Sequence, residues 1–399
     1  MLQLEQAVEL LVNSVLPVAQ TELIPLGQAL GRTLGEDCIA LRDNPPFPRS
    51  PLDGFAVRGA DTAGASRETP TRLRVIGKVF AGEVFSGVVG PGEAVRIMTG
   101  APIPVGADTV IRQEDTDFGT EVISLYSASL PFQHYCPAGE QWKTGDLLLR
   151  KGTYLNAAAI GCLAEQGLET VPVLSRPQVA VISTGDEVVD PGTTLAPGKI
   201  YDSNRLFLTS RLSELGCSPV ESFHCGDDAE ALARQIRCLS QRCQLILTTG
   251  GVSVGEKDIL HQTLELLGAR RLFWKVAVKP GSPTLAALFG DTLLLCLSGT
   301  PSGAAVHFEL LARPVLGKLT GSPCWTVKRR RAALMDDYPK GSKLPRFLRG
   351  SVEGHRVCLA QHSPGNGILT DLTLSNCLVE LPARKEGFSA GEEVWVFCL

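Results

Sequence analysis

Between about residues 176 and 319, short hydrophobic runs that fit strands alternate with longer patterns that fit helices. The run at residues 245–247 is apolar throughout, as expected of a strand that is buried on both faces. Patterns typical of helices occupy residues 203–215, 227–239 and 304–316. This alternation predicts a parallel sheet that is covered by helices on both sides.

The N-terminal segment predicts a helix, because its apolar residues from Leu4 to Val15 follow helical spacing and Pro17 ends the run. The segment lacks the basic region and the cleavage site of a signal peptide. A short strand at residues 22–26 and a helical turn at residues 28–34 are expected next.

Residues 41–140 have another pattern, in which short alternating strands are interrupted by glycine or proline every few residues. Such a pattern is typical of a small β-rich domain. Residues 21–40 and 141–168 flank this insertion and are expected to pair as a small linking α/β domain, with a helical run at residues 156–166. The strands of the insertion are predicted at residues 73–80, 94–98, 109–113 and 122–126.

The C-terminal residues 324–399 again favour short strands and predict a separate β domain of about minimum domain size. Residues 1–20 and 169–323 are then left to the α/β domain. A cationic run at residues 328–331 is more typical of a solvated strand edge than of a binding patch. The predicted strands of this domain are residues 356–360, 377–381 and 394–398.

Four apolar runs of the α/β region end in polar loops that contain glycine. The carboxyl ends of parallel strands lie at one edge of a sheet, where ligands bind, so these loops are expected to form one site. Glycines let backbone N–H groups approach an anion, and a helix that begins there adds a favourable potential. Acidic residues can hold a divalent cation beside that anion. The runs are residues 179–182, 245–247, 276–278 and 293–297.

The pattern therefore predicts a site for phosphate and metal, which a metal-dependent nucleotide phosphohydrolase would also fit. The net charge of −4 gives no basic field for nucleic acid. No apolar run approaches the ~20 residues of a membrane span. The 12 cysteines are scattered without a C-x-x-C pair, which favours reduced, buried thiols in the cytoplasm over zinc ligands.

Several longer motifs stand in one order along the chain: SPLDGFA at residues 50–56, RIMTGAP at 96–102, STGDE at 183–187, IYDSNR at 200–205, GGVSVG at 250–255 and KVAVKPG at 275–281. With them the chain resembles, over essentially its whole length, the MoeA family of molybdopterin molybdenumtransferases, which includes the gephyrin E domain. The resemblance implies a MogA-like α/β domain, two smaller domains ahead of it and a C-terminal β-barrel.

The resemblance also implies an activity and its partners. The family inserts molybdate into adenylylated molybdopterin and releases AMP, with Mg²⁺ assisting. It acts as a homodimer whose cleft uses both subunits, and other molybdenum cofactor biosynthesis proteins are further candidate partners.

By matching position, the resemblance gives three groups of site residues. The residues expected to act in the reaction are Asp53, Thr99, Glu187, Asp227, Asp258, Lys275 and Lys279. Those expected to hold metal are Asp186, Glu187 and Asp258. Those expected to bind the pterin nucleotide are Thr184, Gly185, Gly250, Gly251, Ser253, Gly255, Ser298, Gly299 and Pro301. Asp53 and Thr99 would face the partner's cleft, whereas Asp227 and Asp258 could instead cap helices.

The chain departs from the family pattern at several positions. Gln141 replaces an acid, Ser282 replaces a lysine, and Thr300 and Asn366 stand in altered glycine-bearing loops. These changes put catalytic efficiency in question. They leave a second hypothesis open, in which the chain is an impaired paralogue that binds or carries molybdopterin or its molybdenum cofactor.

Overall fold

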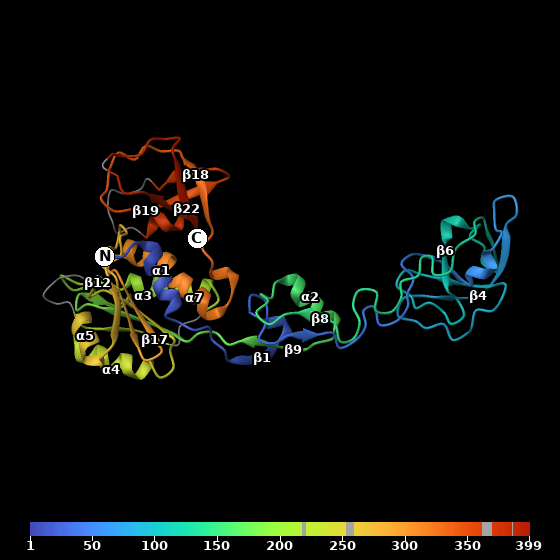
Figure 1. Ribbon diagram of the computed structural model, residues 1–399, viewed down its shortest axis with the longest axis horizontal. Helices are drawn as coiled ribbons and strands as arrows, with labels where there is room; N and C mark the ends of the chain where they lie inside the picture. Colours follow the sequence, from blue (N-terminus) through green and yellow to red (C-terminus); the bar gives the residue numbers. More distant parts are fainter. Residues whose placement is uncertain (218–220, 253–258, 361–368, 385) are drawn as a thin grey trace. The chain divides into compact units, whose positions relative to one another are not determined.

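The structure is a computed structural model that describes residues 1–217, 221–252, 259–360, 369–384 and 386–399 (Figure 1). Contacts divide the chain into two compact units. The first unit comprises Met1–Gly35, Gly152–Asn156 and Val171–Leu399, and the second comprises Glu36–Lys151 and Ala157–Thr170. This division is coarser than the four domains predicted from sequence, whose boundaries stay a prediction.

A six-stranded sheet with the order β13-β10-β14-β17-β16-β15 forms the centre of the first unit. Four neighbouring strands are parallel, but β16 runs antiparallel to both of its neighbours. The sheet is therefore mixed and not purely parallel as predicted, because a tight hairpin at Gly290 joins β16 to β17. The strands are β10 (Val179–Thr184), β13 (Glu221–Cys225), β14 (Leu245–Thr249), β15 (Arg270–Trp274), β16 (Leu285–Phe289) and β17 (Thr292–Leu297).

The strand predicted at residues 276–278 is wrong. Val276 forms only an isolated bridge with Leu2, and the segment is a loop that follows β15. The chain turns at Lys275, whose φ of 71° lies outside the extended region that a strand requires.

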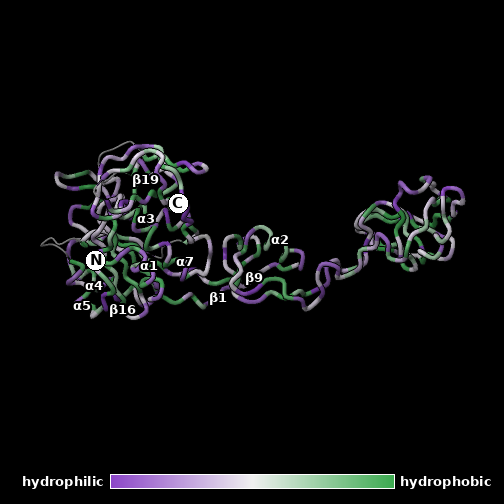
Figure 2. The backbone as a smooth tube through the Cα atoms, turned by 45° about the horizontal axis from the view of Figure 1, so that its top comes forward, coloured by the Kyte–Doolittle hydropathy of each residue, from purple (hydrophilic) through white to green (hydrophobic). Residues whose placement is uncertain are grey.

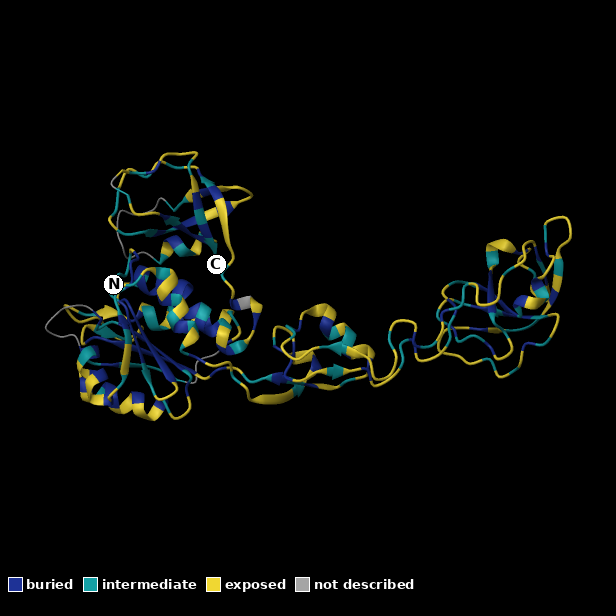
Figure 3. Cartoon of the chain, in the orientation of Figure 1, coloured by how far each residue is buried: buried dark blue, intermediate teal, exposed yellow. Residues whose placement is uncertain are grey.

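Helices cover both faces of this sheet, as predicted (Figures 1 and 3). Leu245 and Leu247 of β14 pack with α1, α3 and α7 on one face, whereas Ile246 packs with α4 and α5 on the other. The helical elements are α1 (Leu4–Asn13), α3 (Ser203–Glu214), α4 (Ala229–Leu239), α5 (Ile259–Leu267), α6 (Pro301–His307), the π-helical η4 (Phe308–Ala312), α7 (Arg313–Thr320) and the 3-10 turn η5 (Pro323–Trp325).

Two small strand pairs complete this part of the chain. They join β1 (Thr21–Pro25) to β9 (Thr170–Leu174) and β11 (Val188–Val189) to β12 (Ile200–Tyr201). The helical turn predicted at residues 28–34 is wrong. The 3-10 turn η1 (Leu26–Gln28) ends where it should begin, and the backbone of Thr33 and Leu34 bridges to Tyr154 and Val173 instead.

The C-terminal part of the first unit is a closed five-stranded barrel with the order β18-β20-β19-β21-β22, which confirms the predicted barrel. Arg329 and Arg331 of β18 lie over the Trp395 ring, 4.4 and 4.3 Å from its centroid. The cationic run is exposed, and Arg329–Arg331 pair only with β22, because β20 pairs with β18 further along, at Ala333 and Leu334. The elements are β18 (Arg329–Leu334), β19 (Arg346–Glu353), β20 (Arg356–Leu359), α8 (Thr370–Thr373), β21 (Cys377–Leu381) and β22 (Glu393–Cys398).

The second unit contains the predicted β-rich sheet, with the strand order β6-β3-β5-β4-β7. Phe55 and Val57 of β3 face one small core and Ala56 faces another. Hydrophobic and hydrophilic stretches alternate along the backbone of both units (Figure 2). The elements are β2 (Cys38–Ile39), β3 (Gly54–Val57), η2 (Gly59–Thr62), β4 (Thr71–Val79), β5 (Glu93–Ile97), β6 (Thr109–Arg112), η3 (Gln113–Asp115), β7 (Val122–Leu125), β8 (Leu147–Leu149) and α2 (Ala157–Glu165).

Two further expectations concern membrane spans and thiols. Within the described ranges, no helix has the length and apolarity needed to cross a bilayer. The 11 cysteines whose side chains the structure describes are free thiols, and more than half of them are buried, as predicted.

Candidate functional site

Three parallel strands end side by side and bring their loops together. Ser183 of β10 is in register with Thr249 of β14, and Thr249 is in register with Leu297 of β17. Side chains then tie the loops to one another. Thr184 Oγ1 donates to Thr249 O at 3.3 Å, and Thr249 Oγ1 donates to Ser298 O at 3.1 Å. The buried threonines therefore hold the three predicted loops as one surface.

Glycines let these loops approach one another closely. Gly250 has a φ of 99°, and a Cβ placed on it would lie 2.7 Å from both Thr184 O and Thr184 Oγ1. A Cβ on Gly299 would lie 3.2 Å from Gly250 Cα. Any other residue at position 250 would push the loops apart, so glycine is required there by contact as well as by backbone conformation, whereas a Cβ at position 299 would need Gly250 to shift slightly.

The first residues of α3 complete this surface. Asn204 Nδ2 donates to Thr249 Oγ1 at 2.9 Å and to Gly299 O at 2.7 Å. Asp202 caps α3 and accepts a bond from Ser183 Oγ at 2.5 Å. Asn204 and Asp202 lie in the motif at residues 200–205, but neither is among the predicted site residues. Their alignment with the strand ends depends on tertiary contacts that spacing cannot reveal.

These groups enclose a cavity of about 70 Å³. Five of the residues that were predicted to bind the pterin nucleotide or metal line it: Thr184, Glu187, Gly250, Gly299 and Pro301. We call this surface the cradle. Gly185 and Gly251 adjoin it in the chain, whereas Ser253 and Gly255 lie outside the described residues.

A pair of carboxylates lies between the loops that follow β10 and β13. Asp227 N donates to Asp186 Oδ1 at 3.0 Å, and Asp186 N donates to Asp227 Oδ2 at 3.3 Å. The cap of α4 is Asp228, whose Oδ1 accepts from Ala231 N at 2.9 Å. The capping alternative for Asp227 is therefore wrong, and Asp227 lies against Asp186 instead.

This pair suits one kind of metal site. Within the described ranges, no group of three or more His, Cys, Asp or Glu side chains could hold a metal ion. Mg²⁺ needs only one or two carboxylates, because water and substrate phosphate supply its other ligands. Asp186 and Asp227 fit that requirement. Glu187 lies on the same loop, with Oε2 2.6 Å from the position of a Cβ on Gly185, and Asp258 falls outside the described residues.

The two predicted lysines lie on the loop after β15. This strand runs parallel to β17, so its carboxyl end points to the same edge of the sheet. Lys275 has its Nζ 4.0 Å from the centroid of the Trp274 ring. Lys279 is exposed, and its backbone pairs with the barrel through Lys279 N to Pro345 O at 2.9 Å. Positive φ in a non-glycine residue such as Lys275 is typical of functional loops.

The altered positions have local partners. We call the loop after β15, which carries Lys275 and Lys279, the lysine loop. Within it, Ser282 Oγ donates to Val276 O at 3.2 Å. Thr300 Oγ1 lies 3.1 Å from Ser298 Oγ. Gln141 Oε1 accepts from Asn44 Nδ2 at 2.7 Å in the second unit. Asn366 lies outside the described residues. None of these contacts replaces the charge of a lysine or an acid.

Asp53 and Thr99 meet in the second unit, just beyond the antiparallel pair β3 and β5. Thr99 donates to Asp53 Oδ1 from its backbone N at 2.8 Å and from Oγ1 at 2.7 Å. These two bonds and the charge of Arg96 lower the pKa of Asp53. The structure thus joins these two predicted residues to each other, and their role in a shared cleft stays a prediction.

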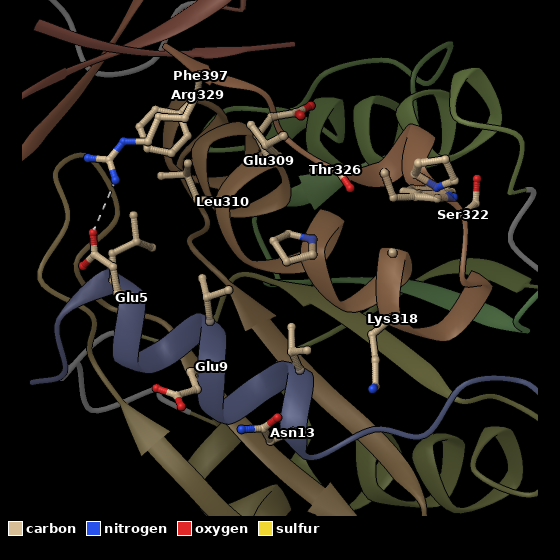
Figure 4. Close-up of a pocket in the computed structure, with 18 of the residues that line it drawn as sticks. Glu5, Glu9, Asn13, Glu309, Leu310, Lys318, Ser322, Thr326, Arg329 and Phe397 are labelled. Carbon is tan, nitrogen blue, oxygen red and sulfur yellow. Dashed lines mark ion pairs between the residues drawn. The ribbon is translucent and has the colours of Figure 1, made fainter. Parts of the chain in front are cut away.

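A larger cavity of about 980 Å³ lies beside α1, α7 and the start of β18 (Figure 4). Arg329 and Glu5 lie on one side of it, with their charged groups 4.0 Å apart. Among the described residues that line it, none belongs to the predicted site. The smaller cradle, and not this cavity, has the chemistry of an anion site.

Comparison with known proteins covers nearly the whole chain. Residues 2–167 match the MoeA N-terminal region (domain I and II), residues 180–318 match a probable molybdopterin binding domain, and residues 331–399 match the MoeA C-terminal region (domain IV). The molybdopterin molybdenumtransferase of Bacillus subtilis (strain 168) is 37% identical over 392 residues, which cover 95% of this chain and 90% of that protein.

Two more proteins are similar to this chain over nearly its whole length. The molybdopterin molybdenumtransferase of Staphylococcus aureus (strain MRSA252) is 35% identical and covers 98% of this chain and 94% of its own length. The crystal structure of a molybdopterin biosynthesis moea protein from Pyrococcus horikosii matches with a TM-score of 0.84 at 33% identity, covering 100% of this chain and 99% of that one. With this sequence identity over nearly the full length and the same fold, the chain belongs to the MoeA family.

Proposed function

We propose that this chain is an enzyme of molybdenum cofactor biosynthesis, a molybdopterin molybdenumtransferase that inserts molybdate into adenylylated molybdopterin and releases AMP. The observation that carries the proposal is the cradle next to the pair Asp186 and Asp227. A glycine-lined surface for anions beside two carboxylates suits a substrate with a pyrophosphate bond. The curated relatives are named as this transferase, which favours the enzyme over the carrier hypothesis.

In this proposal the cradle binds and orients the substrate. The backbone of the Gly250 and Gly299 loops would lie against the phosphates, because the two glycines let these loops come close together. The helix that begins at Pro301 adds a favourable potential for negative charge. Asn204 keeps the Thr249 and Gly299 loops at a fixed spacing. Holding the reacting groups in place lowers the entropic part of the barrier.

Asp186 and Asp227 are the residues that would hold Mg²⁺, together with Glu187 and with Asp258, which was predicted from sequence. A bound Mg²⁺ would act as a Lewis acid on the pyrophosphate oxygens. The side chains of Lys275 and Lys279 would stabilise the negative charge of molybdate and of the leaving phosphate. Each of these roles is electrostatic, so each should respond to removal of one charge.

The proposal includes a homodimer in which Asp53 and Thr99 of one protomer act in the cleft of its partner. Support comes from the family motifs at residues 50–56 and 96–102, which contain this fixed, solvent-accessible pair. Sedimentation at micromolar concentration should therefore give a dimer, and a monomer would contradict it.

Mixing two inactive variants tests the shared cleft. Asp53→Asn and Lys275→Ala should each be inactive alone, and together they should recover about a quarter of native activity. Half of randomly assorted dimers are mixed, and each mixed dimer keeps one intact cleft. No recovery after exchange of subunits would show that Asp53 and Lys275 of the same protomer act in one cleft.

The cytoplasm is the proposed location, because the described thiols are free. Burial raises the pKa of Cys217 to about 11 and that of Cys377 to about 12, so these thiols stay protonated and unreactive.

The activity is tested by measuring AMP release from adenylylated molybdopterin with and without molybdate. Release that depends on molybdate is expected. Tight binding without AMP release would favour the carrier hypothesis. Turnover of ordinary nucleotides would favour the phosphohydrolase.

A further inference from the structure

The last residue of α6, His307, lies completely buried behind the cradle. Its Nδ1 is 3.2 Å from the backbone nitrogen of Ser298, which donates to it. A ring nitrogen that accepts a hydrogen bond has no proton. The neutral imidazole therefore has its proton on Nε2.

The opposite side of the ring packs on the lysine loop. A Cβ on Gly281 would lie 2.6 Å from His307 Nε2 and 2.9 Å from Cε1. Nε2 is buried and has no hydrogen-bond partner of good geometry among the described residues. The ring thus occupies the space that any larger residue at position 281 would need.

One buried ring therefore touches both loops that carry the predicted chemistry. Ser298 directly precedes Gly299 of the cradle, and Gly281 lies two residues after Lys279. Gly303 of α6 tightens this packing, because its Cα is 3.2 Å from the position of a Cβ on Gly281. A change in the ring would move the cradle and the lysine loop relative to each other.

We propose that His307 is a positioning residue that fixes the spacing between the cradle at Gly299 and the cation of Lys279. It does so as a neutral imidazole, with Nδ1 holding the Ser298 backbone and the Nε2 edge seating Gly281. The inference rests on the proposed function, because it concerns how the two loops hold one anionic substrate. His307 itself is too deeply buried to touch that substrate.

Charge on the ring would undo this arrangement. A protonated imidazole would carry hydrogen on Nδ1 as well, and it would face the N–H of Ser298 donor to donor. Burial lowers the pKa of His307 to about 4, and the Gly281 backbone offsets this only in part. The ring therefore stays neutral at neutral pH.

Two substitutions separate positioning from packing. His307→Leu keeps an apolar side chain but removes the acceptor, whereas His307→Asn returns an acceptor near the Nδ1 position. We expect His307→Leu to lower kcat/KM for molybdate-dependent AMP release at least tenfold, about the effect of one buried hydrogen bond. His307→Asn should recover most of that loss.

Thr292→Val is the matched control for lost stability. Thr292 is buried in the same sheet, at the end of the strands that is opposite to the cradle. Its Oγ1 donates to Cys243 O at 2.7 Å. This variant should lose a buried hydrogen bond and keep native kcat/KM. Native kcat/KM in His307→Leu, equal losses in the Leu and Asn variants, or an equal loss in Thr292→Val would each overturn the proposal.

A spectroscopic measurement tests the proposal even if His307→Leu fails to fold. The ¹⁵N resonances of the His307 ring, assigned by their absence in His307→Asn, should show a protonated Nε2 and a bare Nδ1 from pH 5.5 to 8. A protonated Nδ1, or titration near the ordinary histidine pKa, would overturn the inference. Absence of AMP release by the native protein would instead contradict the proposed function and leave this ring measurement intact.

Discussion

The cradle and the Asp53–Thr99 pair are both predicted parts of one reaction, yet they are built in different ways. The cradle joins three buried strand ends through threonine hydroxyls and glycines that leave no room for a Cβ. Asp53 is held by a single threonine on a partly exposed surface. The first depends on backbone geometry and the second on one polar contact. Substitutions of the cradle glycines should therefore have steep effects, whereas loss of the Thr99 hydroxyl should have a shallow one.

The Asp53–Thr99 contact also has a twin in the same unit. Thr144 donates to Asp43 Oδ1 from its backbone N and from Oγ1, both at 2.8 Å. As for Asp53, the bond from the threonine backbone is the main cause of a lowered pKa at Asp43. The geometry alone thus occurs where no function is predicted. What distinguishes Asp53 is its family motif, not its hydrogen bonds.

The largest effect is expected from Gly250→Ala. Its Cβ would collide with Thr184 O, and alanine rarely adopts the φ of 99°. We expect at least a ~100-fold loss of AMP release, because displacing reacting groups by about 1 Å can cost that much.

Gly290→Ala is the control, since Gly290 has a φ of 59° and open space around it at the opposite edge of the sheet. It should be destabilised by about 1–2 kcal/mol, the cost of a left-handed residue with a Cβ, and remain active. Equal losses of activity in the two variants would mean that the loss comes from general destabilisation and not from a change in the cradle.

A smaller effect concerns pH and stability. The pKa of His307 is lowered from 6.5 to about 4 in the folded chain, so folding favours the neutral ring. Its contribution is complete above pH 6.5 and is lost as the pH falls toward 4. Between pH 7 and 5, the native protein should lose about 2 kcal/mol more unfolding free energy than His307→Asn. Parallel stability curves would show that His307 titrates normally when folded.

Much of the cradle could be predicted because parallel strands place their carboxyl ends at one edge, whatever their exact bounds. Other parts could not. Hydrophobic periodicity does not distinguish a buried loop from a strand, which is why residues 276–278 were misassigned. Asp227 and Asp228 are neighbours with the same chemistry, and only the tertiary fold decides that Asp228 caps α4. Asn204 aligns with the strand ends only after α3 has packed on the sheet.

The smallest effect is expected at Thr99. Thr99→Val removes the hydroxyl bond but keeps the backbone bond, so the pKa of Asp53 should rise toward its ordinary range. AMP release should fall by about tenfold or less, the effect of one hydrogen bond. Thr144→Val should raise the pKa of Asp43 in the same way without changing the activity. Carboxyl NMR titration and the AMP assay, run on both variants, would separate a functional pair from a structural one.

In the proposed function, the cradle and the carboxylates beside it carry out the reaction. The most direct test compares molybdate-dependent AMP release in native protein, Asp227→Asn and Asp228→Asn at saturating Mg²⁺. Asparagine still caps a helix, so Asp228→Asn should retain native activity. Asp227→Asn should lose about 100-fold, because it removes a charge that acts directly in the site. Native activity in Asp227→Asn, or an equal loss in both variants, would contradict the account.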